Sequence, residues 1–104
     1  MKRGEIWWAE LAPPVGRRPV VILTRDAAVG VRNQLVVAQV TRSIHHLPVE
    51  VSLDRSDGMP KVCVINCDVL LTVPKSHFIS RIIRLSSQKM LELEAAIKHA
   101  LELC

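Results

Sequence analysis

Aromatic side chains are scarce in this sequence. Only Trp7, Trp8 and Phe78 occur among 104 residues, and there is no tyrosine. Proteins that bind single-stranded nucleic acid by base stacking use several aromatic side chains on one surface. Three are too few for such a platform, so any binding to RNA would depend on charge, backbone groups and small polar side chains. Trp7 and Trp8 are adjacent in a predicted strand and point to opposite faces, so at most one belongs to the core.

Long apolar runs and export signals are also missing. No segment approaches the ~20 consecutive apolar residues that a membrane-spanning helix needs. The start of the chain, Met1-Lys2-Arg3-Gly4-Glu5, leads directly into Ile6-Trp7-Trp8 without an extended apolar segment or a cleavage site of small residues. We therefore expect a cytoplasmic protein that does not interact with a membrane.

The sequence has three cysteines, an odd number: Cys63, Cys67 and Cys104. Without export features, reduced thiols are expected. Cys63 and Cys67 could form a zinc set with His45 and His46, but their spacing within a strand is unlike a structural zinc knuckle and favours buried, unreactive thiols. Gly-rich phosphate loops, helical metal-binding histidine pairs and Gly-x-Ser-x-Gly elbows are absent as well. We expect neither a bound metal nor a cofactor.

The length allows one compact domain over residues 1–104. Apolar residues make up 49% of this short chain, which favours a homodimer that hides part of the apolar surface. The net charge is +4, and residues 1–46 carry seven Lys or Arg against three acidic residues. Such a concentration of positive charge suits a polyanionic partner, although a solvated basic face would have the same pattern.

The remaining patterns predict a mostly β domain closed by one helix. The expected strands are Glu5–Ala9, Pro19–Thr24, Leu35–Thr41, Val49–Leu53, Val62–Asn66, Leu70–Val73 and Ile79–Leu85. A helix capped by Ser86 or Ser87 follows, with a stripe for core or dimer contact formed by Met90, Leu93, Ile97, Ala100, Leu101 and Cys104. Consecutive short strands with little helix between them predict a mostly antiparallel sheet curled into a small barrel.

The segment Arg17-Arg18-Pro19-Val20-Val21-Ile22 places two guanidinium groups beside a proline and a β-branched run. A continuous apolar run is typical of a strand buried on both faces, and proline suits the start of such a strand. Arg18 would then be held rigidly at the strand end as a site for an anion such as phosphate. The alternative is a solvated basic pair that protects a sheet edge.

Thr41-Arg42-Ser43 ends the third predicted strand. If the second and third strands pair in antiparallel fashion, Arg18 and Thr41 meet at one end of the sheet. A guanidinium fork and a hydroxyl donor would then lie about one phosphate apart.

Several motifs in order along the chain resemble the MazF/PemK toxins of bacterial toxin–antitoxin pairs. They are Arg3-Gly4-Glu5-Ile6-Trp7, Arg18-Pro19-Val20-Val21, Val40-Thr41, and the stretch from Asn66 to Lys75. The resemblance covers almost the whole chain. It departs at residues 13–17, where this sequence has a short segment with two prolines and family members often have a longer loop rich in Gly, Ser and basic residues.

The resemblance implies an SH3-like small barrel of the CcdB/PemK type with a C-terminal helix, assembled as a homodimer. It also implies a sequence-specific, metal-independent endoribonuclease that cuts single-stranded RNA to leave 2′,3′-cyclic phosphate and 5′-hydroxyl ends. Translation and growth would be inhibited until an antitoxin with an acidic, flexible tail covers the basic groove. The family's catalytic residues correspond to Arg18 and Thr41. We expect Arg17, Arg42, Ser43 and Lys75 to bind the RNA.

Two other functions fit parts of the pattern. A CcdB-like gyrase inhibitor would share the fold without being an enzyme, but those toxins act through a C-terminal Trp-Gly-Ile, and this sequence has Leu103-Cys104 there. A plain RNA-binding module would use the basic half of the chain and cut nothing. His45, His46 and His77 could carry protons, but surface histidines without a role are the favoured interpretation.

Overall fold

The computed structural model describes all 104 residues and consists of one six-stranded sheet with short helical elements around it. The elements are β1 (Glu5–Leu11), β2 (Gly16–Ile22), α1 (Asp26–Val29), β3 (Gln34–Thr41), β4 (Glu50–Leu53), η1 (Arg55–Asp57), β5 (Cys63–Pro74), η2 (Lys75–His77), β6 (Phe78–Arg84) and α2 (Ser87–Leu101). The strand order is β4-β5-β3-β2-β1-β6, and all neighbouring strands are antiparallel. The predicted mostly β fold with a C-terminal helix is confirmed.

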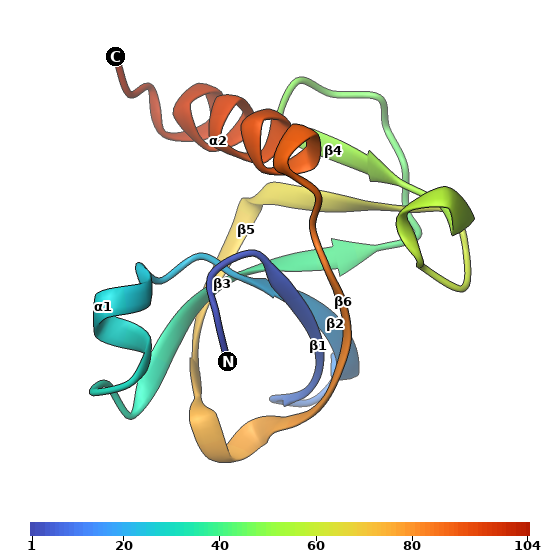
Figure 1. Ribbon diagram of the computed structural model, residues 1–104. Coiled ribbons are helices and arrows are strands. Elements are labelled where there is room, and N and C mark those ends of the chain that lie inside the picture. The colour runs from blue at the N-terminus through green and yellow to red at the C-terminus, as the bar shows by residue number, and fades with distance from the viewer.

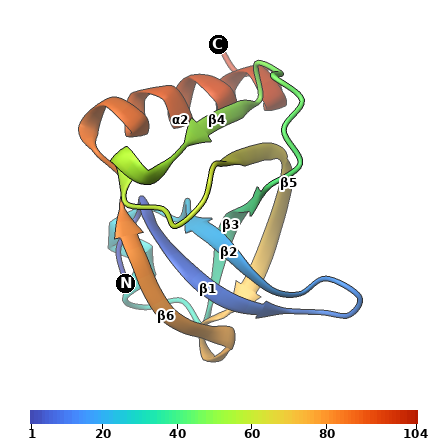
Figure 2. The same ribbon diagram turned by 90° about the vertical axis from the view of Figure 1, so that its right-hand side faces the viewer.

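The sheet curls into a half-barrel, with α2 lying across β4 and β5 at one end (Figure 1). Seen from the side, the β1–β2 hairpin projects well beyond the body of the molecule (Figure 2).

Side chains on the two faces of each strand contribute to different apolar layers. Ile6 and Val21 belong to the layer beneath α2, whereas Ala9 and Val20 belong to the layer inside the barrel. Val20, Val21 and Ile22 are all fully buried, as predicted for a strand covered on both faces.

Strand β5 is continuous, where the sequence predicts two separate strands, Val62–Asn66 and Leu70–Val73. Its pairing with β3 skips between Ala38, which lies opposite Leu70, and Gln39, which lies opposite Asn66. At this irregularity the Asn66 side chain accepts a hydrogen bond from the Asp68 amide at 2.9 Å, so the local chemistry is that of a turn. Pairing on both sides of the bend keeps the strand intact and converts the turn into a bulge.

Helix α2 begins after Ser86, whose hydroxyl accepts a hydrogen bond from the Lys89 amide at 3.1 Å. Leu93 and Ala96 are buried, and Met90, Ile97 and Ala100 pack against the same layer. The last two positions of the predicted stripe lie outside the core of the single chain, because Leu101 is half exposed and Cys104 lies beyond the helix and is exposed. The helix ends at Leu101, and Glu102 adopts a left-handed conformation. No helix combines the length and the apolar character needed to cross a bilayer.

A glycine joins the start of the chain to three elements. The Gly4 amide donates to the Ile22 carbonyl at 2.8 Å, and its carbonyl accepts from the Leu85 amide at 3.0 Å. Gly4 has φ of +89°, and a Cβ there would lie 2.7 Å from the Met90 sulfur. Only glycine combines this backbone conformation with such a close approach. The Arg3-Gly4-Glu5 motif is therefore a structural turn that holds β2, β6 and α2 together.

Glu5 is the one buried acidic residue, and its carboxylate is well supplied with donors. Its side chain accepts from the Lys2 amide and the Trp7 indole nitrogen, each at 3.0 Å, and forms an ion pair with Arg81 at 3.3 Å. Burial alone would raise the pKa of Glu5, but the hydrogen bonds from Trp7, Lys2 and Arg81 together hold the pKa below its ordinary value of 4.5. The ionised form therefore stabilises the folded chain.

We expect Glu5→Gln to lower the free energy of unfolding at pH 7 by about 1.5–3 kcal/mol, because the variant lacks charge-assisted hydrogen bonds. The folded pKa lies below the unfolded pKa, so the contribution is complete above the unfolded value and is lost as pH falls through the folded value. Urea unfolding between pH 7 and pH 3 should show the two proteins converging at acid pH. Glu10→Gln, which changes an exposed carboxylate on the same strand, should parallel the wild type throughout.

Candidate active site

A cleft of about 430 Å³ opens where β2 and β3 part. One part of its lining is polar and consists of Arg17, Arg18, Thr41, Arg42, Ser43 and Lys61. The other part is mostly apolar and consists of Trp8, Pro19, Val40, Met59, Pro60 and Cys63. The end of β3 and the turn after β4, which border the cleft, lie on the right in Figure 1 and toward the viewer in Figure 2.

The cleft exists because the β2–β3 ladder stops early. The two strands pair from Ile22 opposite Val37 to Val20 opposite Gln39, and β2 before Val20 pairs only with β1. Pro19 lies at this point, opposite Trp8, and is the fourth residue of β2. The prediction that the strand starts at Pro19 is therefore wrong. Proline is tolerated inside the strand because its missing N–H leaves no ladder bond unmade on the open side.

Beyond the last β2–β3 pair, Val20 opposite Gln39, the same register leads to Arg18 on β2 and Thr41 on β3, although the two strands no longer pair there. Both residues line the cleft. Arg18 is partly buried, yet none of the three ion pairs in the structure involves it. Its guanidinium is therefore held by the strand and is free to bind an anion.

The hydroxyl of Thr41 is oriented by the loop that follows it. Its oxygen accepts a hydrogen bond from the Ser43 amide at 3.1 Å. A threonine hydroxyl carries one hydrogen as well as its acceptor lone pairs, so the hydrogen remains available to donate. Arg18 and Thr41 thus contribute donors of two kinds, one charged and one neutral, to the lining of the cleft.

The loop between β3 and β4 is shaped by one carboxylate. Glu50 accepts hydrogen bonds from the His45 amide at 3.0 Å and the Leu47 amide at 3.2 Å. Desolvation would raise the pKa of Glu50, but the backbone donors of Leu47 and His45 and the nearby His45 side chain lower it. The loop is thereby fixed in a shape that keeps Arg42 and Ser43 on the cleft wall.

The charge in the cleft has a single sign. Arg17, Arg18, Arg42 and Lys61 line it, and no aspartate or glutamate does. Cys63 contributes to the floor, but burial raises its pKa and keeps the thiol protonated. Cys67 is buried as well, with its pKa raised by burial to about 11. Both thiols are free, as expected for buried cysteines without a catalytic role. The arrangement favours binding of a polyanion.

Five of the six predicted site residues line this cleft: Arg17, Arg18, Thr41, Arg42 and Ser43. Lys75 does not. It lies in η2, where its amide donates to the Asn33 carbonyl at 2.9 Å, beside the start of β3. Thr41 is at the other end of that strand, so Lys75 lies outside this cleft, and its role in RNA binding stays a prediction.

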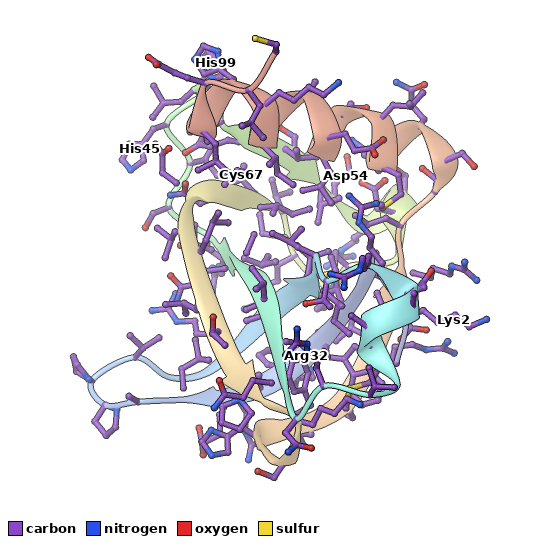
Figure 3. The ribbon with its side chains drawn as sticks, turned by 90° about the vertical axis from the view of Figure 1, so that its left-hand side faces the viewer. Lys2, Arg32, His45, Asp54, Cys67 and His99 are labelled. Atoms are coloured by element: carbon purple, nitrogen blue, oxygen red, sulfur yellow. The ribbon has the colours of Figure 1, made fainter.

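The lining residues that the sequence did not predict for the site include Lys61 and Trp8. Lys61 follows the Asp57-Gly58 turn, and only the packing of the β4–β5 segment brings it to the end of β3. Trp7 and Trp8 are adjacent in β1, so alternation predicts that they face different environments. Alternation does not predict that Trp8 is the one that lines the cleft. The histidines do not line the cleft. His45, for example, projects from the edge of the molecule (Figure 3).

Comparison with known proteins agrees with this geometry. Residues 2–101 match the family model described as PemK-like, MazF-like toxin of type II toxin–antitoxin systems. The chain belongs to this family. Among PemK/MazF relatives, the probable endoribonuclease MazF5 of Mycobacterium tuberculosis is 38% identical over 96% of this chain and 92% of its own length. The probable endoribonuclease MazF2 of the same species is 40% identical over 88% of this chain and 89% of its own length.

Solved structures of the PemK/MazF family confirm the barrel. The Mycobacterium tuberculosis toxin MazF-mt6 has a TM-score of 0.88 and 30% sequence identity, and the match covers 96% of this chain and 98% of the toxin. A mycobacterial endoribonuclease in complex with its cognate antitoxin has the same TM-score at 21% identity, with 100% of this chain and 97% of the other covered. The latter similarity is one of fold.

Proposed function

We propose that this protein is an endoribonuclease toxin that cuts single-stranded RNA in the cleft at the end of β2 and β3. The observation that carries the proposal is that Arg18 and Thr41 line one cleft together with three further cationic residues and no carboxylate. Family membership and relatives named as endoribonucleases support the same activity.

The proposed reaction is a transesterification within the RNA. The 2′-hydroxyl loses its proton to solvent as its oxygen attacks the adjacent phosphorus, the bond to the 5′-oxygen of the next nucleotide breaks, and that oxygen takes up a proton from solvent. The products are a 2′,3′-cyclic phosphate and a 5′-hydroxyl. Negative charge grows on the phosphoryl oxygens during attack, so donors fixed at that position lower the barrier. In this proposal Arg18 and Thr41 supply these donors. Since the pKa of arginine exceeds ~12, its role is electrostatic and not that of a proton acceptor.

The remaining cationic and polar residues of the cleft have a binding role in this proposal. Arg17, Arg42 and Lys61 neutralise flanking phosphates, and Ser43 adds a neutral donor. The same basic surface suits the acidic, flexible tail of an antitoxin, which would compete with RNA for it. We expect a homodimer acting in the cytoplasm, where cleavage of RNA would inhibit translation and growth.

Purified protein incubated with a long single-stranded RNA in excess EDTA should yield discrete fragments, because the proposed chemistry uses only this chain's donors. Polynucleotide kinase should label the new 5′ ends without prior phosphatase treatment, and the 3′ ends should be cyclic phosphates. Sequencing the labelled ends would map the cleavage site.

An RNA that remains intact but shifts in a native gel would contradict the proposal and identify a non-catalytic RNA-binding module. Intact RNA without a shift, combined with inhibition of gyrase supercoiling, would instead identify a CcdB-like inhibitor. Cleavage that stops in EDTA would retain the nuclease and overturn the metal-independent mechanism.

A further inference from the structure

The two adjacent tryptophans have different environments. Trp7 contacts Phe78 edge to face, with ring centroids 6.2 Å apart, and its indole nitrogen donates to Glu5. Trp8 points to the opposite face of β1, is partly exposed, and forms part of the cleft wall. No hydrogen bond and no aromatic pair in the structure involves the Trp8 side chain. The Trp7 side chain therefore has polar and aromatic partners within the fold, whereas the Trp8 indole has neither and lines the cleft.

We propose that Trp8 stacks on the nucleobase next to the scissile phosphate and so selects unpaired RNA. The inference rests on the proposed function and goes beyond it, since it assigns one base-stacking residue, whereas the scarcity of aromatic side chains predicts RNA binding by charge, backbone groups and small polar side chains alone. Stacking on an aromatic ring is available to every base, because each has a π face. A base inside a duplex is already stacked on its neighbours, so Trp8 favours RNA whose bases are free.

The position of Trp8 relative to the proposed catalytic pair supports this assignment. Trp8 lies directly opposite Pro19, the residue that follows Arg18. Strand alternation places Trp8 and Pro19 on one face of the hairpin and Arg18 on the other. Both faces reach the cleft because β2 has no neighbour on its open side before Val20. An RNA strand crossing this open edge can place its phosphate on the Arg18 side and an adjacent base on the Trp8 side.

The chemistry of the surrounding wall also fits a base. Trp8 and Pro19 share the cleft lining with Val40, Met59 and Pro60. The cationic residues that would bind phosphates are Arg17, Arg18, Arg42 and Lys61. A nucleotide has the same division into a flat, largely apolar base and an anionic phosphate. Trp8 therefore supplies affinity and strand selectivity, while discrimination between bases requires the polar groups nearby.

Tryptophan fluorescence provides a direct test, since Trp7 and Trp8 are the only tryptophans. In a Trp7→Phe background, Trp8 is the sole emitter. The ligand is an oligonucleotide that spans the mapped cleavage site and carries a 2′-deoxy residue at the attacking position, so that it binds without being cut. Saturating binding should quench the emission. Among oligonucleotides with one abasic position each, one next to the scissile phosphate should abolish the quenching and weaken binding by about 10- to 100-fold.

Kinetics of three substitutions separate stacking from packing. Trp8→Leu and Trp8→Ala should both raise KM by about 10- to 100-fold with a smaller change in kcat, whereas Trp8→Phe should remain within about fivefold of the wild type. Binding of a fully paired duplex should change little, so the preference for single strands should fall in the Leu and Ala variants. Thermal melting verifies that each variant is folded.

Unchanged Trp8 emission at saturation, or Trp8→Leu as active as Trp8→Phe, would overturn the stacking role while leaving the nuclease intact. A wild-type protein that neither binds nor cuts RNA would instead refute the proposed function itself. The two failures are therefore distinguishable.

Discussion

Replacing Arg18 with alanine should reduce the rate of RNA cleavage by about 10²–10³-fold, the usual effect of removing one donor from a developing oxyanion. The fold should be preserved, because Arg18 has no ion-pair partner that would be left with an unpaired charge. Single-turnover cleavage of the mapped oligonucleotide measures the rate, and thermal melting measures the stability. Arg18→Lys should recover only part of the activity, since an ammonium lacks the planar fork of a guanidinium.

Arg32→Ala is the matched control for Arg18→Ala. Arg32 is an exposed arginine near α1, just before β3, whereas Thr41 is at the opposite end of that strand (Figure 3). The control removes one positive charge from the chain but none from the cleft. At 0.15 M salt the Debye length is about 8 Å, so a more distant exposed charge is largely screened. Cleavage by Arg32→Ala should therefore stay within about twofold of the wild type. An Arg18→Ala variant retaining more than a tenth of wild-type activity would contradict the role assigned to Arg18.

Thr41→Val should reduce the cleavage rate by about 10²-fold, because valine has the shape of threonine but no hydroxyl to donate. Thr41→Ser keeps the hydroxyl and should remain within about tenfold of the wild type. The Ser43 amide, which donates to the Thr41 oxygen at 3.1 Å, belongs to an exposed residue and can bond to water in the valine variant. The stability of the two variants should therefore be similar, as melting curves would show.

The double variant tests whether Arg18 and Thr41 act on one transition state. If both donate to the same phosphoryl group, their effects are not additive, and Arg18→Ala with Thr41→Val should be at most about tenfold slower than Arg18→Ala alone. Losses that multiply in full would mean that the two residues act independently. Loss of activity in Thr41→Ser equal to that in Thr41→Val would point to packing and not to the hydroxyl.

Local sequence was a good guide where side-chain patterning alone decides the structure. The apolar run Val20-Val21-Ile22 predicts a strand covered on both faces, and Ser86 caps α2 as one of the two expected serines. The proximity of Arg18 and Thr41 follows from pairing two strands in antiparallel order, which is also the observed arrangement. Their catalytic roles stay predictions until the variants are measured.

Sequence was a poor guide where distant segments compete with local preference. Asn66-Cys67-Asp68 forms a local turn, yet pairing with β3 and β4 turns it into a bulge within one strand. At Pro19 the pairing of β2 with β3 has ended, while its pairing with β1 continues. The end of the pairing depends on where β3 diverges from β2, which the local sequence does not determine. Lys61 lines the cleft and Lys75 does not. The order of the strands in the sheet decides which strand ends lie near the cleft, and spacing along the chain does not reveal that order.

The β1–β2 hairpin has an exposed tip and a paired region, and the sequence of the tip can change without altering the paired region. Its tip, residues 12–15, is exposed and lies beyond the last strand pair, Leu11 opposite Gly16. Arg18 and Trp8 are anchored further back, within the paired region. Insertions at an exposed tip leave the strand register behind it unchanged. The tip can therefore be lengthened or exchanged without moving Arg18 or Trp8, which makes it a natural site for inserting new segments.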